Sequence, residues 1–222
     1  MLYIVATPIG NLEDITLRAK RIIGEVDFVL AEDTRRTGNL LKLMDIKKKL
    51  VSFHEHSDQG KLDWIIGQLK DGDCSIAYIC DAGTPNLSDP GGKLVEAAVE
   101  NGIQTVPVPG VSALTALISV APFSCANFLF LGYFPKKKGR EKMAEYIKNQ
   151  SLPVFFYESP HRIQKTLLFL SDRLAGYRVL IGRELTKMHE EVKFLDLQDK
   201  KEFEKITERG EFVLAIVRAR KL

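Results

Sequence analysis

Cysteine is scarce in this 222-residue sequence, which contains only Cys74, Cys80 and Cys125. The number is odd, and no two cysteines have the CxxC spacing. A framework of disulfides or a cysteine-based zinc site is therefore not expected, and the composition fits a reducing compartment. We predict a cytoplasmic protein.

Long apolar runs are also missing. No stretch approaches the length of a membrane-spanning helix, so we expect no membrane association. The first ten residues, MLYIVATPIG, have the pattern of a strand and lack the basic start of a signal peptide. The remaining composition, 45% hydrophobic and 27% charged, is ordinary for a globular protein.

Several common motifs of ligand-binding and catalytic sites are absent. No strand-like run is followed by GxGxxG, and neither GxxxxGK[ST] nor GxSxG occurs. A dinucleotide-type Rossmann loop, a P-loop and a hydrolase nucleophile elbow are therefore not expected. His54 and His56 flank Glu55, but a pair at this spacing without a third ligand favours a polar loop over a metal site. We expect no metal.

The sequence does contain a regular alternation of strand-like and helix-like segments. Apolar runs rich in Val, Ile, Phe and Tyr occur at residues 2–7, 26–31, 75–80, 103–108, 127–133, 153–158, 178–183 and 212–218. Segments with helical spacing lie between them, among them residues 63–70, 91–101, 140–150 and 161–175. This alternation predicts an α/β protein with mainly parallel or mixed sheets.

A change of composition near residues 121–127 indicates a domain boundary. A proline and small polar residues separate two series of strands and helices there. We predict an N-terminal α/β domain over residues 1–120 and a C-terminal α/β domain over residues 124–222.

The loops that follow the predicted strands are unusually rich in Gly, Pro, Ser, Thr and charged residues. The clearest case is CDAGTPNLSDPGG at residues 80–92, between a buried strand and a helix. Ligands of open α/β sheets bind beyond the carboxyl ends of the strands. We therefore expect these loops to line a ligand cleft between the two domains.

Positive charge is concentrated in three short clusters, although the formal net charge is only +3. They are KKK at residues 47–49, KKKGR at residues 136–140 and RARK at residues 218–221. Each cluster alone is typical of a solvated loop or helix end. The three together favour an anionic partner.

Seven blocks of sequence carry a resemblance to a known family. They are YIVATPIGNLEDITLRA, AEDTRRTGNLL, SFHEH, DAGTPNLSDPG, VPVPGVSAL, FFYESPHR and RELTKMHEE, in this order. The sequence resembles the ribosomal RNA small subunit methyltransferase I family of the tetrapyrrole methylase superfamily over nearly its whole length. The resemblance implies an enzyme that uses S-adenosylmethionine to methylate the ribose 2′-oxygen of a cytidine in the decoding region of 16S rRNA, within the 30S subunit.

The resemblance also implies which residues bind the cofactor. In the first domain they are Asp81, Ala82, Gly83, Thr84, Pro85, Ser88, Asp89, Pro109, Gly110, Val111 and Ser112. In the second domain they are Tyr157, Glu158 and Ser159. Glycine lets the backbone approach a ligand closely, and proline fixes it at low entropic cost. For Asp89, a structural role as the N-cap of the next helix is an equal alternative.

Substrate contacts are implied at the loops around the same cleft and at the basic segment. The residues are Pro8, Gly10, Asn11, Arg35, His54, Arg162, Lys136, Lys137, Lys138 and Arg140. For Pro8 to Asn11, the alternative is a plain turn with Asp14 at the start of the next helix. For the basic segment, the alternative is a solvated loop.

The sequence does not identify a general base for removing the proton of the ribose hydroxyl. Candidates are Glu32, Asp33, Glu55, Lys187 and His189, and catalysis without a protein base is also open. Asp33 could equally form an ion pair with Arg35 that orders its loop.

Two other functions stay in view: methylation of a small tetrapyrrole, and a non-catalytic role as a ribosome-associated binder. Many members of the family extend beyond the strand that ends near Arg218, whereas this sequence stops at Leu222. Either the two predicted domains bind the RNA by themselves, or the target differs. The superfamily is usually dimeric, and apolar residues near the boundary (Phe123, Phe128 and Phe130) are compatible with the homodimer that we predict.

Overall fold

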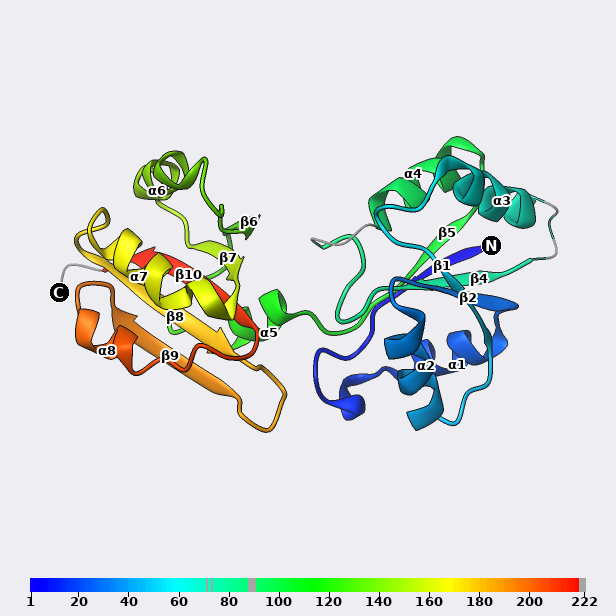
Figure 1. The fold of residues 1–222 in the computed structure, drawn as a ribbon, viewed down its shortest axis with the longest axis horizontal. Coiled ribbons are helices and arrows are strands. Elements are labelled where there is room, and N and C mark those ends of the chain that lie inside the picture. The colour runs from blue at the N-terminus through cyan, green and yellow to red at the C-terminus, as the bar shows by residue number, and fades with distance from the viewer. Residues whose placement is uncertain (71, 73, 88–90, 220–222) are drawn as a thin grey trace. The chain divides into compact units, whose positions relative to one another are not determined.

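A computed structural model describes residues 1–70, 72, 74–87 and 91–219 of the chain (Figure 1). The chain forms two compact units, Met1–Ser112 and Ala113–Leu222. In the described residues, no helix is both long enough and apolar enough to cross a membrane.

The first unit is a parallel sheet with helices on both faces. Its elements are β1 (Leu2–Val5), η1 (Leu12–Asp14), α1 (Leu17–Glu25), β2 (Phe28–Ala31), α2 (Thr34–Leu43), β3 (Lys49–Ser52), α3 (Gln59–Lys70), β4 (Ile76–Ile79), α4 (Gly91–Glu100) and β5 (Thr105–Val108). The strands pair in the order β3-β2-β4-β1-β5, each parallel to its neighbours. All their carboxyl ends therefore lie at one edge of the sheet.

Alternation along the strands sends successive side chains to two separate cores. Leu30 and Ile76 belong to the core under α3 and α4. Val29 and Ala77, one residue away in each strand, belong to the core under α1 and α2. Figure 1 shows the two helix pairs on opposite faces of the sheet. Because both faces are covered, the strands are apolar throughout, as expected for a parallel sheet.

The second unit is built on a mixed sheet. Its elements are α5 (Ala113–Ser119), β6 (Leu129–Tyr133), α6 (Arg140–Lys148), β7 (Val154–Glu158), η2 (Pro160–Arg162), α7 (Ile163–Ser171), β8 (Tyr177–Arg183), β9 (Glu191–Asp196), α8 (Lys200–Glu204) and β10 (Phe212–Arg218). The strand order is β6-β7-β10-β8-β9, in which only β6 and β7 are parallel. Helices α6, α7 and α8 contribute Ile147, Leu167 and Phe203 to its core.

The predicted α/β class with mainly parallel and mixed sheets is confirmed. We expected the boundary between the two domains at residues 121–127, whereas the two compact units divide after Ser112. Helix α5 belongs to the second unit, where it packs against β10 and its Leu117 lies beside Gly182. A Cβ on Gly182 would come within 2.9 Å of the Leu117 side chain, so the glycine makes room for this helix.

Two strands that the sequence did not indicate, β3 and β9, are edge strands of the two sheets. β3 reads KLVS and β9 reads EVKFLD, and no residue of either is fully buried. Charged residues are common on edge strands because they discourage pairing with other chains. They also weaken the apolar signal by which a strand is predicted.

Candidate functional site

The loops after β1 and β4 are joined by backbone hydrogen bonds at the carboxyl edge of the first sheet. The Thr7 N–H donates to the Gly83 carbonyl at 2.9 Å, and the Gly83 N–H donates to the Thr7 carbonyl at 3.0 Å. The buried Thr7 hydroxyl donates to the Cys80 carbonyl at 3.3 Å. The segment after β4 is therefore held as an extension of the sheet.

Two predicted cofactor residues, Gly83 and Gly110, occupy places where a Cβ would be crowded. Gly83 has φ +80°, and a Cβ there would lie 3.2 Å from Cγ2 of Ile9. A Cβ on Gly110 would lie 2.9 Å from the Cβ of Ala6, so the loop after β5 packs closely against the residue that follows β1. The Thr84 hydroxyl donates to the Val111 carbonyl at 3.3 Å and joins the loops after β4 and β5. The three loops thus form one ordered edge.

Asp81 connects this edge to the loop after β2. Its Oδ1 accepts a hydrogen bond from the Asp33 N–H at 3.2 Å, and its Oδ2 pairs with Arg36 Nη1 at 2.9 Å. Glu32 Oε2 accepts from the Asp81 N–H at 3.5 Å. The Asp81 side chain stays 25% exposed. The predicted candidates Glu32, Asp33 and Asp81 therefore lie side by side.

Asp33 has a structural function at the start of α2. Its Oδ1 accepts from the Arg35 N–H at 2.8 Å and from the Arg36 N–H at 3.4 Å, as an N-cap does. The guanidinium that enters an ion pair at this edge is that of Arg36, and both Arg35 and Arg36 are exposed. Sequence reasoning missed Arg36 because its partner, Asp81, lies 45 residues away.

The remaining predicted residues of the first unit vary in exposure. Pro85 and Ser112 are buried, whereas Ala82, Pro109 and Gly10 are exposed. Pro8 is half-buried, and Ser88 and Asp89 lie outside the described residues, so their predicted roles stay predictions. Asn11 caps η1 by accepting from the Glu13 N–H at 3.1 Å. The following helix α1 starts after Thr16, its N-cap, and not at Asp14.

His54, Glu55 and His56 form an exposed turn after β3. The Ser57 N–H donates to the His54 carbonyl at 2.9 Å, and the His54 N–H donates to Ser57 Oγ at 3.0 Å. Across residues 1–70, 72, 74–87 and 91–219, no three His, Cys, Asp or Glu side chains lie together as a metal site would require.

In the second unit, Glu158 forms a buried cross-link. The residue is 2% exposed, and its carboxylate pairs with Arg162 at 2.5 Å while accepting from the Thr166 hydroxyl at 2.6 Å. Arg162 also donates to Ser159 Oγ at 2.9 Å and to the Phe134 carbonyl at 3.2 Å. Two predicted ligand residues, Glu158 and Arg162, are thus already engaged with each other.

The loop between β8 and β9 holds Lys187 in an ion-pair network. Lys187 Nζ lies 2.9 Å from carboxylate oxygens of both Glu184 and Glu211. Partial burial acts to lower the pKa of Lys187, but these two hydrogen bonds outweigh it and hold the pKa above its ordinary value. The side chain is therefore a positive charge at neutral pH, which disfavours a role as general base. His189 is exposed on the same loop.

The basic segment 136–140 has two parts. Lys136, Lys137 and Lys138 are exposed on the loop between β6 and α6. Arg140 begins α6, and its guanidinium stacks over the rings of Phe134 at 5.1 Å and Phe169 at 4.5 Å. The three lysines are available to a partner, whereas Arg140 is packed against the core of the second unit.

Comparison of the sequence with those of known proteins identifies the family of the chain. A family model for tetrapyrrole (corrin/porphyrin) methylases matches residues 1–201. The protein of Borrelia garinii subsp. bavariensis named ribosomal RNA small subunit methyltransferase I is 43% identical over 224 residues, covering 99% of each chain. The chain belongs to the ribosomal RNA small subunit methyltransferase I family. Its Thermotoga maritima member is 44% identical over 190 residues, 86% of this chain and 85% of the relative.

The predicted family is therefore confirmed.

Solved structures with much lower sequence identity have a similar fold. Uroporphyrin-III-C-methyltransferase from Thermus thermophilus has a TM-score of 0.67 at 18% identity, covering 96% of this chain and 93% of that chain. Diphthine synthase has a TM-score of 0.74 at 13% identity, covering 100% of this chain and 90% of that chain. These two likenesses concern the fold alone.

Proposed function

We propose that the chain is an S-adenosylmethionine-dependent methyltransferase that methylates the ribose 2′-oxygen of a cytidine in the decoding region of 16S rRNA. The main support is the identity of 43% across 99% of the chain to a protein named ribosomal RNA small subunit methyltransferase I. The ribose and the cytidine follow from the family resemblance carried by the seven sequence blocks.

The strand-end loops of the first unit fit this cofactor. Its carboxylate, ammonium, ribose and adenine groups require donors and acceptors that are fixed before binding. Gly83 and Gly110 bring backbone to the edge where a Cβ would crowd Ile9 or Ala6. The partly exposed Asp81 carboxylate can accept a hydrogen bond from a hydroxyl or an ammonium. We assign cofactor binding to Asp81–Pro85 and Pro109–Ser112.

The protein's contribution to the chemistry is mainly alignment. S-adenosylmethionine supplies a methyl group that its sulfonium already activates. A ribose hydroxyl is a weak nucleophile, so holding it in line with that methyl gives the larger part of the rate gain. Among the predicted bases, Asp33 caps α2, Lys187 is held as an ammonium, and Glu55 and His189 lie exposed on a turn and a loop. We therefore assign the base to Glu32, which lies beside Asp81.

The proposed partner is the 16S rRNA within the 30S subunit, which places the protein in the cytoplasm. The exposed Lys136, Lys137 and Lys138 are suited to contact RNA phosphates. When ammonium groups neutralise phosphates, the counterions condensed on the RNA are released, which favours binding. We also propose a homodimer. Sedimentation of a single 25.0 kDa species at micromolar concentration contradicts the dimer.

The test of this function combines cofactor binding with methyl transfer. Calorimetry should detect S-adenosylmethionine binding that Asp81→Ala weakens, while the variant stays folded. Purified protein should transfer labelled methyl to undermethylated 30S particles and not to free tetrapyrroles. Transfer to a tetrapyrrole alone indicates the small-molecule alternative, and cofactor binding unchanged in Asp81→Ala refutes the site.

A lysine variant tests the RNA contact separately. Replacing Lys136, Lys137 and Lys138 by Ala should weaken binding to 16S rRNA and flatten its salt dependence, with cofactor affinity unchanged. Arg140 stays in place in this variant, because its stacking supports the second unit. Equal RNA affinity of variant and wild type at every salt concentration identifies the loop as an ordinary solvated turn.

A further inference from the structure

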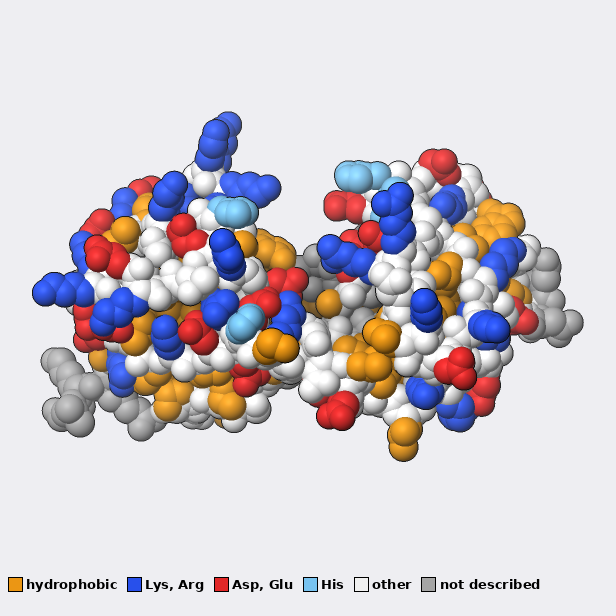
Figure 2. Space-filling model, turned by 60° about the horizontal axis from the view of Figure 1, so that its bottom comes forward, with side chains coloured by type: hydrophobic (Ala, Val, Ile, Leu, Met, Phe, Trp, Pro, Cys, Tyr) orange, Lys and Arg blue, Asp and Glu red, His pale blue; other side chains and the backbone are white. Residues whose placement is uncertain are grey.

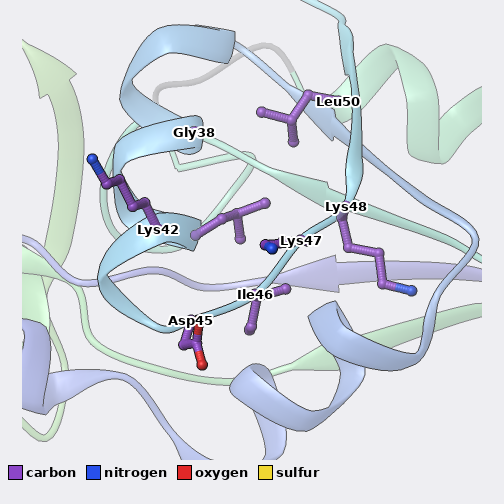
Figure 3. Close-up of a pocket in the computed structure, with 8 residues that line it drawn as sticks. Gly38, Lys42, Asp45, Ile46, Lys47, Lys48 and Leu50 are labelled. Atoms are coloured by element: carbon purple, nitrogen blue, oxygen red, sulfur yellow. The ribbon is translucent and has the colours of Figure 1, made fainter.

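The first unit carries a second basic surface, at the opposite end of α2 from Asp33. A pocket of about 300 Å³ lies between the C-terminal half of α2 and the start of β3. Its lining consists of Gly38, Leu41, Lys42, Asp45, Ile46, Lys47, Lys48 and Leu50. Figure 3 shows Lys42 and Lys48 on opposite sides of this pocket, with Lys47 between them. The floor is apolar and the rim is basic.

Two of the three lysines at the rim have no evident structural function. Lys48 donates from Nζ to the Val26 carbonyl at 2.5 Å and so ties the loop to the end of α1. Lys42 and Lys47 are exposed, and neither lies within 4.0 Å of a carboxylate of any described residue. Asp45 is the only acidic residue in the lining, against three lysines.

The end of α2 does not need these lysines either. Its last carbonyls already accept backbone hydrogen bonds: Leu40 and Leu41 from the Met44 N–H, and Lys42 from the Asp45 N–H. A cation near a helix C-terminus is often explained by such carbonyls. The carbonyls of Leu40, Leu41 and Lys42 are thus satisfied without a lysine side chain, and the exposed ammonium groups of Lys42 and Lys47 are accessible to an external anion.

A row of exposed polar residues leads from the rim along α2 toward the strand-end loops and ends at one further cation, Arg35. Arg35, Asn39 and Lys42 are all exposed, and their i, i+4, i+7 spacing places them on one face of the helix. The rise from Arg35 to Lys42 is about 10 Å. Cations at the two ends of this stretch can therefore contact separate phosphates of one nucleic-acid strand, since the phosphates of a DNA strand are about 3.4 Å apart along the axis. Figure 2, which turns the α1 and α2 side of the first unit forward, shows several Lys and Arg side chains on this face.

We infer that Lys42 and Lys47 bind phosphates of the substrate RNA backbone, and that Arg35 continues this path toward Asp33 and Glu32. The inference rests on the proposed function, since it specifies how the RNA reaches the strand-end loops. Lysine is suited to this role because its ammonium pairs with phosphate as a point charge, without demanding one orientation. The contact is independent of base sequence and sets affinity and register.

A charge-matched pair of double variants tests the inference. In Lys42→Ala/Lys47→Ala, two charges are removed from the pocket rim. In the control, Lys70→Ala/Lys93→Ala, two exposed lysines are removed from α3 and α4, on the opposite face of the same sheet. Filter binding to unmodified 16S rRNA over a range of salt concentrations, methyl transfer to 30S particles and S-adenosylmethionine calorimetry are measured for both variants and the wild type.

The rim variant should reduce the slope of log affinity against log salt by about 1.4 to 1.8, because each lost phosphate contact contributes roughly 0.7 to 0.9. Its RNA affinity at low salt should fall at least tenfold, with cofactor affinity and the rate at saturating RNA unchanged. The control should keep the wild-type slope. Equal slopes in the two variants, with methyl transfer intact, overturn this inference alone. Absence of transfer and of RNA binding in the wild type overturns the proposed function and this inference with it.

Discussion

Replacing Gly83 by Ala tests whether the strand-end edge is both rigid and functional. Gly83 has φ +80°, where an L residue costs about 1–2 kcal/mol. The new Cβ would also lie 3.2 Å from Ile9 Cγ2, so that side chain has to yield slightly. Against a typical domain stability of about 5–15 kcal/mol, this loss leaves the first unit folded.

The same strain should appear in cofactor affinity. If the loop relieves this strain by moving, cofactor binding has to restore the original backbone. A cost of about 1.4 kcal/mol then corresponds to a tenfold higher dissociation constant. We expect roughly tenfold weaker S-adenosylmethionine binding in Gly83→Ala by calorimetry, with a lower urea midpoint. The β-branched Gly83→Val should lose more of both.

Two other glycines provide matched controls for the same chemical change. Gly102 has φ +68° and nothing within 4 Å of a built Cβ, so Gly102→Ala should lose about 1–2 kcal/mol without affecting cofactor binding. Gly67 lies inside α3 with open space around it, so Gly67→Ala should stabilise the unit by about 0.8–1.0 kcal/mol. Wild-type stability and wild-type cofactor affinity in Gly83→Ala together refute the reasoning.

Three further predictions concern the second unit. Arg162→Ala should cost about 3–5 kcal/mol in urea unfolding, because it leaves the buried Glu158 carboxylate unpaired; a loss below about 1 kcal/mol contradicts this. Arg140→Ala should lower the unfolding midpoint through lost stacking on two aromatic rings, whereas Lys137→Ala, on the exposed loop, should not. Glu184 has a lowered pKa despite partial burial, owing to its hydrogen bonds, so its stabilisation is present above the unfolded value of about 4.3 and is lost as the pH falls through the folded pKa. Stability measured from pH 6 to pH 3 should therefore fall less steeply in Glu184→Gln than in the wild type, and parallel profiles contradict the assignment.

Much of the candidate site could be predicted from the sequence, for a simple geometric reason. Polar loops after β1, β4 and β5 were visible as Gly- and Pro-rich stretches. Parallel strands place their carboxyl ends at one edge, so loops that are distant in sequence meet there without any further information. The hydrogen bonds between Thr7 and Gly83 are the local result of that rule.

The tertiary structure decided which charges are used and which remain available. Asp81 pairs with Arg36 and not with a neighbour in sequence, and Lys187 pairs with Glu211, 24 residues away. The sequence does not show which residues of a basic cluster are packed and which are exposed. In the structure, Arg140 packs on aromatic rings and Lys137 is exposed. Sequence periodicity reports which face of an element is apolar. The partner of a polar side chain depends on how elements pack in three dimensions, and only the folded chain fixes that.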